Sequence, residues 1–214
     1  MTRSLFITAT NTNVGKTYTT LQLIDILGKK GLRPGVFKPI ETGVTHQAPD
    51  ATALLEACQR FNPDFASLST DDITTYTFSL PAAPFCADTK KIIDPATIIE
   101  HYHTLREKCD LLLVEGAGGL MVPITQTYLM AHLIKELDTP ALLVTPSRLG
   151  CINETLLSIT ALHQFDIDFE WCVNLYEDKA QFATVTQPYY DAVFPHWWQL
   201  ETGLEAYIQR LLSQ

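Results

Sequence analysis

The segment Leu5-Phe6-Ile7-Thr8-Ala9-Thr10-Asn11-Thr12-Asn13-Val14-Gly15-Lys16-Thr17 decides the fold class of this chain. Its apolar start predicts a buried strand, and the periodic residues that follow predict a helix. Gly15-Lys16-Thr17 is the closing half of a Walker A loop, in which backbone N–H groups and a helix N-terminus surround phosphates. The lysine of such a loop reaches the β- and γ-phosphates, and the hydroxyl binds Mg²⁺.

The motif is weak by itself, because a bare Gly-Lys-Thr is common and the strict pattern has glycine where this chain has Thr10. An ordinary polar loop that caps a helix is the alternative interpretation. The placement of the motif between the first strand and the first helix favours phosphate binding over that alternative. Lys16 and Thr17 are therefore candidate ligands of a metal-bound nucleotide.

Apolar runs alternate with helical segments along the rest of the chain, which is typical of a parallel sheet flanked by helices. Buried strands are predicted at residues 5–8, 35–39, 111–114, 141–144 and 171–175. Helices are predicted at residues 16–30, 50–58, 95–108, 128–137, 151–164 and 201–212, and residues 179–196 are ambiguous. No linker divides the sequence. We expect residues 1–214 to form a single doubly wound α/β domain of the P-loop NTPase type.

Composition excludes several classes of partner. A net charge of −9 disfavours binding to nucleic acid, whose phosphate backbone requires a basic surface. No apolar run approaches the roughly 20 residues that span a bilayer, and the first residues do not resemble a secretory signal, so we expect a cytoplasmic protein without a membrane partner. The five scattered cysteines favour reduced thiols over disulfides or a zinc site.

A lysine ends the second predicted strand, in Val36-Phe37-Lys38-Pro39-Ile40-Glu41-Thr42-Gly43. Ligands of doubly wound sheets bind outside the carboxyl ends of the strands. A lysine at the end of a buried strand is costly unless it meets an anion, so Lys38 is a candidate anion-binding residue. Asp50 precedes the next helix, where it is either an N-cap or a metal ligand.

The third relevant strand delivers one carboxylate followed by glycines, in Asp110-Leu111-Leu112-Leu113-Val114-Glu115-Gly116-Ala117-Gly118-Gly119. This pattern has the character of a Walker B strand, and the glycines allow the backbone to approach a ligand closely. A glycine-rich turn with an incidental acid is the alternative. The joint presence of Lys16, Thr17, Asp50 and Glu115 at strand ends favours one metal–triphosphate site.

Four segments, in this order and spacing, resemble the dethiobiotin synthetase family closely: TNTNVGKT (10–17), VFKPIETG (36–43), LLLVEGAGGLMVPI (111–124) and RLGCINETLL (148–157). The resemblance covers residues 4–175 and is expected to fade after Leu175. There, Phe194-Pro195-His196-Trp197-Trp198 replaces the family's Gly-Glu-Ile-Pro-like segment, so base recognition is the least transferable feature.

The resemblance implies a ligase that acts as a homodimer. Such an enzyme carboxylates 7,8-diaminononanoate with CO2 or bicarbonate, phosphorylates the carbamate with ATP as substrate and Mg²⁺ as cofactor, and closes a ureido ring.

The resemblance also implies which residues form the site. The implied catalytic residues are Lys38, Lys16 and Thr12, and the implied metal ligands are Thr17, Asp50 and Glu115. The implied nucleotide-binding residues are Asn13, Val14, Gly15, Lys16, Thr17, Tyr18, Glu115, Gly118 and Asn174, with Asn174 at the base. The implied substrate-binding residues are Thr12, Lys38, Thr42, Gly118, Gly119, Leu149, Gly150, Cys151 and Asn153, the last four contributed by the other subunit.

Three other interpretations fit the sequence less well. An amidoligase would carry a glutaminase domain, for which 214 residues leave no room. A partition or septum-site ATPase would carry a signature lysine where this chain has Asn11. A binding protein with a lapsed P-loop would not need the intact Lys16, Thr17 and Glu115.

Overall fold

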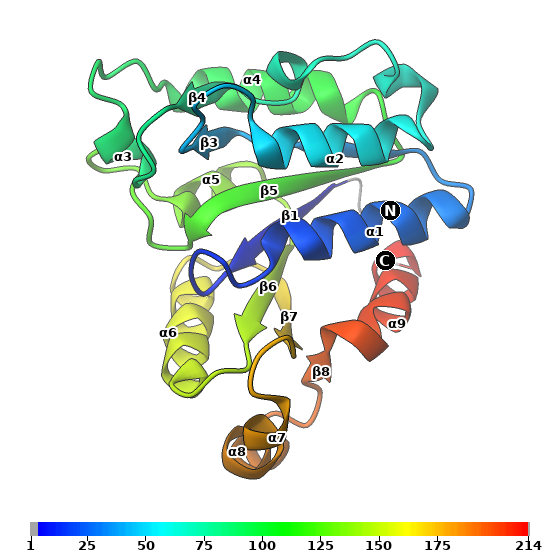
Figure 1. Cartoon of the computed structure of the whole chain (residues 1–214), viewed down its shortest axis with the longest axis vertical. Helices are drawn as coiled ribbons and strands as arrows, with labels where there is room; N and C mark the ends of the chain where they lie inside the picture. The colour runs from blue at the N-terminus through cyan, green and yellow to red at the C-terminus, as the bar shows by residue number, and fades with distance from the viewer. Residues whose placement is uncertain (1–3, 214) are drawn as a thin grey trace.

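The computed structural model describes residues 4–213, which form a six-stranded sheet with parallel pairing throughout (Figure 1). The strand order is β2-β5-β1-β6-β7-β8. The strands are β1 (Ser4–Ala9), β2 (Pro34–Phe37), β5 (Leu111–Gly119), β6 (Ala141–Pro146), β7 (Phe169–Asn174) and β8 (Trp198–Gln199). All five predicted strands are present, and the parallel α/β fold is confirmed.

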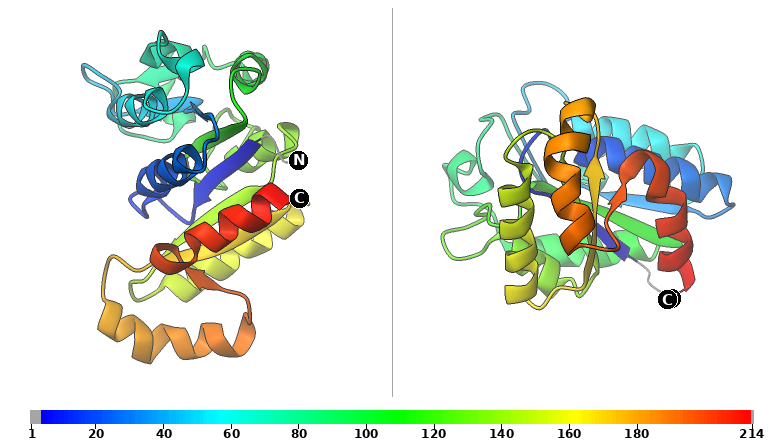
Figure 2. Two further views of the ribbon diagram at one scale, coloured as in Figure 1. Left: turned by 90° about the vertical axis from the view of Figure 1, so that its right-hand side faces the viewer. Right: turned by 90° about the horizontal axis from the view of Figure 1, so that it is seen from below.

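Helices cover both faces of the sheet (Figure 2). On one face, α1 (Lys16–Lys29) packs against α2 (Pro49–Gln59) and α9 (Leu200–Ser213). The other face carries α4 (Pro95–Arg106), α5 (Met130–Glu136) and α6 (Cys151–Gln164). Between residues 4 and 213, no helix combines the length and apolar content needed to cross a bilayer.

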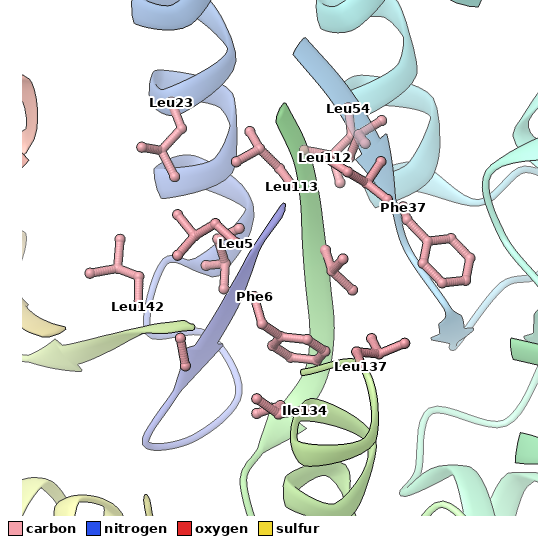
Figure 3. Close-up of a cluster of buried hydrophobic side chains, with 14 of the residues drawn as sticks. Leu5, Phe6, Leu23, Phe37, Leu54, Leu112, Leu113, Ile134, Leu137 and Leu142 are labelled. Carbon is pink, nitrogen blue, oxygen red and sulfur yellow. The ribbon is translucent and has the colours of Figure 1, made fainter. Parts of the chain in front are cut away.

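The core lies on both sides of β1, whose six residues are all buried. Successive side chains of a strand point to opposite faces. Leu5 accordingly lies toward Leu23 of α1, whereas Phe6 points toward Ile134 of α5 (Figure 3). Full burial of such a side chain stabilises the fold by roughly 1.5–3 kcal/mol. This is why the continuous apolar runs form the central strands.

The second strand is shorter than predicted and is followed by a separate small sheet. β2 ends at Phe37, because Pro39 has no N–H group with which to continue a strand ladder. The backbone of Lys38 instead donates to the carbonyl of Ile73 at 2.9 Å. The chain then enters β3 (Ile40–Thr42), which pairs in parallel with β4 (Tyr76–Phe78).

Three short helical segments complete this region: η1 (Pro63–Phe65), η2 (Thr70–Asp72) and α3 (Pro84–Ala87). The predicted helix at 128–137 begins later, at Met130. The carbonyl of Tyr128 accepts hydrogen bonds from the amides of Ile124 and Thr125, so that residue belongs to a turn.

The ambiguous segment is helical but irregular. It contains α7 (Lys179–Gln181), a π-helical turn η3 (Phe182–Thr186) and α8 (Gln187–Val193). A proline has no N–H group to donate to the carbonyl four residues earlier, and a π turn accommodates such an interruption at Pro188. The wider turn shifts the buried face, which explains why periodicity did not predict a helix here.

Candidate functional site

The loop between β1 and α1 depends on a left-handed glycine. Gly15 has a φ of 106°, and α1 begins immediately after it at Lys16. A Cβ at this position would lie 2.2 Å from the side-chain nitrogen of Asn174. Any larger residue would therefore be strained in its backbone and would also collide with β7.

Two side chains hold this loop through hydrogen bonds: Asn174, the last residue of β7, and Tyr176, two residues after it. The Asn174 amide donates to the carbonyl of Val14 at 3.0 Å, and the Tyr176 hydroxyl donates to the carbonyl of Asn13 at 2.8 Å. Asn174 is buried. In this structure its side chain supports the loop, and its expected contact with a nucleobase stays a prediction.

Glu115 is the centre of a buried network at the carboxyl end of β5. Its side chain is fully buried, and Oε1 accepts hydrogen bonds from Lys38 Nζ at 2.6 Å and Thr17 Oγ1 at 2.9 Å. Oε2 accepts from Thr20 Oγ1 at 2.8 Å. Thr20 lies one turn after the P-loop, and the sequence interpretation missed it. Lys38 Nζ also lies 3.3 Å from Asp50 Oδ2.

The two lysines of the site have opposite electrostatic environments. Burial and the neighbouring charge of Lys38 lower the pKa of Lys16 to about 8, and its ammonium donates to the Asn11 carbonyl at 3.1 Å. Burial opposes the charge of Lys38 as well, but the attraction of Glu115 and Asp50 outweighs it and raises the pKa of Lys38. Lys38 was expected to meet an anion, and the anions that it meets in this structure are the carboxylates of Glu115 and Asp50.

A pocket of about 650 Å³ opens above these groups. Ten of the expected site residues line it: Thr12, Asn13, Gly15, Lys16, Thr17, Tyr18, Lys38, Thr42, Asp50 and Gly118. Residues 81–84 and Val122 also line it, and the sequence interpretation did not include them. The lining is apolar at these residues and charged at Lys16, Lys38, Glu41 and Asp50, which together with the adjoining Glu115 are called the charged side of the pocket.

The other expected residues lie apart from the pocket lining. Val14 and Glu115 are buried beneath it, and a Cβ on Gly119 would lie 3.0 Å from the Thr10 carbonyl, so Gly119 serves close packing of two backbones. Leu149, Gly150, Cys151 and Asn153 lie at the start of α6 and outside the pocket of this chain. The side chain of Cys151 is fully buried, whereas Leu149 is exposed.

The alternative role of Asp50 as a helix cap is wrong. The residue before α2 is Ala48, and Pro49 and Asp50 are the first two residues of the helix. The amide of Asp50 donates to the Glu41 carboxylate, so another side chain does the capping. The Asp50 carboxylate itself is left to face the ammonium of Lys38.

The oxygen atoms of Thr17, Asp50 and Glu115 suit Mg²⁺, which prefers hard oxygen ligands. Between residues 4 and 213, no group of three or more His, Cys, Asp or Glu side chains is arranged to hold a metal. Nucleotide phosphates and water would therefore supply the remaining ligands, as is usual for this ion. The residues present fit a metal that arrives with a nucleotide.

Solved structures show the fold that this arrangement belongs to. A plasmid partition protein from Borrelia burgdorferi superimposes with a TM-score of 0.63 over 98% of this chain and 99% of its own, at 9% identity. So low an identity shows a shared fold and leaves the activity open.

Sequence relatives are more specific. A family model described as an AAA domain matches residues 3–171. An ATP-dependent dethiobiotin synthetase of Sulfurovum sp. (strain NBC37-1) is 62% identical over 97% of this chain and 99% of its own length. Another, from Wolinella succinogenes, is 36% identical over 99% of each chain. Both alignments extend beyond Leu175, whereas the family model ends at residue 171, so the expected loss of resemblance after Leu175 holds for the family model and is wrong for these two relatives. The chain belongs to the ATP-dependent dethiobiotin synthetase family.

Proposed function

We propose that this chain forms dethiobiotin from 7,8-diaminononanoate, CO2 and Mg-ATP in the cytoplasm, with release of ADP and phosphate. CO2 adds to one amine with loss of a proton and gives a carbamate. A carbamate oxygen attacks the γ-phosphorus while the bond to ADP breaks. The second amine then attacks the carbamate carbon, the ureido ring closes and phosphate leaves.

The observation that carries the proposal is the pair of buried lysines, Lys16 and Lys38, beside one pocket. The carbamate and the γ-phosphate are both anions, so bringing them together in a site of low dielectric constant costs several kcal/mol. Lys16, Lys38 and the metal held by Asp50 and Glu115 would together offset this repulsion and neutralise charge during phosphoryl transfer. No covalent protein nucleophile is required, because positioning and charge are sufficient.

The pocket divides into two sides. Gly15, Lys16 and Thr17 would bind the triphosphate, since a helix N-terminus and its free amides favour anions. Lys38, Thr42 and Thr12 would bind the carbamate side, where hydroxyls and an ammonium can donate to its oxygens. Lys38 keeps its proton because Glu115 and Asp50 raise its pKa.

Thr17, Asp50 and Glu115 would hold the Mg²⁺, which supplies charge neutralisation for the phosphates. Glu115→Gln and Asp50→Asn should therefore raise the Mg²⁺ concentration needed for half-maximal activity. An unchanged midpoint in either variant would remove that residue from the metal site.

The reaction itself is tested by phosphate release. We expect release that depends on both the diamine and bicarbonate, measured with each omitted in turn. Release that continues at the full rate without the diamine would mean a nucleotide switch, and the synthetase assignment would be abandoned.

We further propose that the active form is a homodimer in which residues 149–153 bind the far carboxylate of the diamine bound to the partner. Helix α6 starts at Cys151, and free amides at a helix start favour an anion. α6 and α8 pack together through the Tyr190–Thr155 hydrogen bond, and exposed apolar side chains lie on or beside them: Leu149, Leu157, Tyr189 and Val193. A second copy would cover this surface.

The dimer is tested by mixing two damaged chains. Asn153→Asp should raise the KM for the diamine by placing a negative charge against its carboxylate, while the KM for ATP stays nearly unchanged. Mixing this variant with Lys16→Ala should restore activity, because a heterodimer contains one intact site. If heterodimers form without any recovery of activity, both halves of the site belong to one chain.

A further inference from the structure

Glu41 lines the pocket together with Lys38 and Asp50, and its carboxylate binds the start of α2. Glu41 lies in β3 and is only 4% exposed. Its Oε1 accepts a hydrogen bond from the Asp50 amide, and its Oε2 accepts one from the Ala51 amide, both at 2.9 Å. These residues are the second and third of α2. Glu41 therefore takes the place that a capping side chain occupies at a helix N-terminus.

α2 needs this distant acceptor because its own N-cap is Ala48, whose methyl group accepts no hydrogen bond. A buried amide without a partner typically costs about 1–3 kcal/mol. A carboxylate also interacts favourably with the positive end of the helix dipole. A cap from β3 differs from a local cap in one respect: it ties the helix to the strand that follows Lys38.

This tie determines where the Asp50 carboxylate lies. The Asp50 side chain is 43% exposed, so packing around it does little to confine it. Its backbone is fixed by Glu41, and its Oδ2 lies 3.3 Å from Lys38 Nζ. Lys38 Nζ lies 2.6 Å from Glu115 Oε1. Glu41 thus fixes the backbone at the exposed end of the charge network, where Asp50 lies, relative to its buried end at Glu115.

We propose that Glu41 is a positioning residue for the metal–nucleotide site: by binding the amides of Asp50 and Ala51, it sets the distance between the Asp50 carboxylate and the Lys38–Glu115 pair. The inference rests on the proposed function, because it takes Asp50 as a ligand of Mg²⁺. Both oxygens of Glu41 accept from backbone amides, so we expect it to act through Asp50 although it also lines the pocket. Loss of a residue that orients a metal ligand typically weakens metal affinity 10–100-fold.

The test uses Glu41→Gln, which keeps the size of the side chain but leaves one oxygen to accept from two amides. The measurement is the affinity for a fluorescent ATP analogue, titrated with and without Mg²⁺, so that it does not depend on turnover. We expect the Mg²⁺ concentration at half-maximal binding to rise about tenfold or more. Affinity without Mg²⁺ should stay as in the unaltered protein. An unchanged Mg²⁺ midpoint would overturn the inference.

A second variant separates positioning from plain helix capping. Glu41→Ala combined with Ala48→Ser supplies a local cap to α2 without the connection to β3. We expect this double variant to regain thermal stability relative to Glu41→Ala alone, while its Mg²⁺ midpoint stays raised. If the local cap restores the midpoint as well, Glu41 is a helix cap and nothing more.

Asp50→Asn distinguishes a failure of this inference from a failure of the proposed metal site. If Asp50→Asn raises the midpoint and Glu41→Gln adds nothing further in the double variant, Glu41 acts through Asp50. If Asp50→Asn raises the midpoint and Glu41→Gln alone does not, the inference is wrong and the metal site stands. If Asp50→Asn has no effect, the metal role of Asp50 is wrong and the inference fails with it.

Discussion

The charged side of the pocket and the segment after β7 are stabilised in opposite ways. In the first, Glu115 is fully buried and is bonded to three side-chain donors: Lys38, Thr17 and Thr20. In the second, the aromatic rings of Phe182, Tyr190, Phe194 and Trp197 pack against one another and against Trp171 of β7 in a separate small core.

The difference concerns how much each region depends on the chemical identity of its residues. A buried charge tolerates few replacements, because removing its partner leaves an uncompensated charge. Apolar contacts tolerate exchange among side chains of similar volume. Substitutions at the charged side should therefore have the larger effects on activity and stability. Exchanges among apolar side chains of similar volume in the aromatic segment should have small effects.

The largest effect is expected from Lys38→Ala. Loss of a cation from the site should lower turnover by roughly 10²–10³. Removal of the partner of buried Glu115 should also destabilise the fold by roughly 3–5 kcal/mol. Lys16→Ala should lower turnover similarly without a loss of stability, because burial and Lys38 already disfavour the Lys16 charge and lower its pKa. Turnover and urea unfolding of both variants check this.

A matched control for Lys38 is the double variant Lys38→Ala, Glu115→Gln, which removes the unpaired charge. It should recover most of the lost stability and none of the turnover. Equal stability losses in Lys16→Ala and Lys38→Ala would contradict the distinction between the two lysines.

A smaller effect is expected from pH. Burial and the charge of Lys38 lower the pKa of Lys16 to about 8, and bound triphosphate should raise it by stabilising the ammonium. Above pH 8, binding therefore takes up a proton, and affinity for ATP should fall by up to about tenfold per pH unit. Below pH 8 affinity should be nearly constant. Lys16→Arg is the control, because a guanidinium stays charged and should give a flat profile between pH 7 and 9.5. A flat profile for the unaltered protein would contradict the lowered pKa.

The smallest effect is expected from the base of the nucleotide. The Asn174 amide and the Tyr176 hydroxyl donate to the P-loop, which leaves them poorly placed to select a base. kcat/KM for ATP, GTP and CTP should differ by far less than the roughly 10⁴ that a buried polar recognition site reaches. A preference for ATP near 10⁴ would mean that the segment after β7 contains a specific base pocket.

Periodicity and motif position predicted the sheet and most of the charged side, for identifiable reasons. Buried parallel strands are nearly continuous apolar runs, and Lys16, Thr17 and Glu115 occupy fixed positions relative to strands β1 and β5. The salt bridge between Lys38 and Glu115 could not be predicted, because it depends on how β2 pairs with β5.

Other features depend on contacts that no local pattern reveals. Glu41 caps a helix that begins eight residues later, and Thr20 reaches Glu115 from the second turn of α1. In the segment after β7, the π turn before Pro188 interrupts the helical repeat. Apolar periodicity is the signal for a helix, so a change of repeat within 15 residues removes it.

The support of the P-loop by β7 also sets an order of events during synthesis. Val14 and Asn174 are 160 residues apart, and Asn13 and Tyr176 are 163 residues apart. Contacts between such distant residues require the closure of a long chain and cannot form until the second partner has left the ribosome. A nascent chain that ends before β7 contains the whole phosphate-binding motif without its two supporting hydrogen bonds. The first motif in the sequence is therefore among the last parts of the molecule to reach its final form.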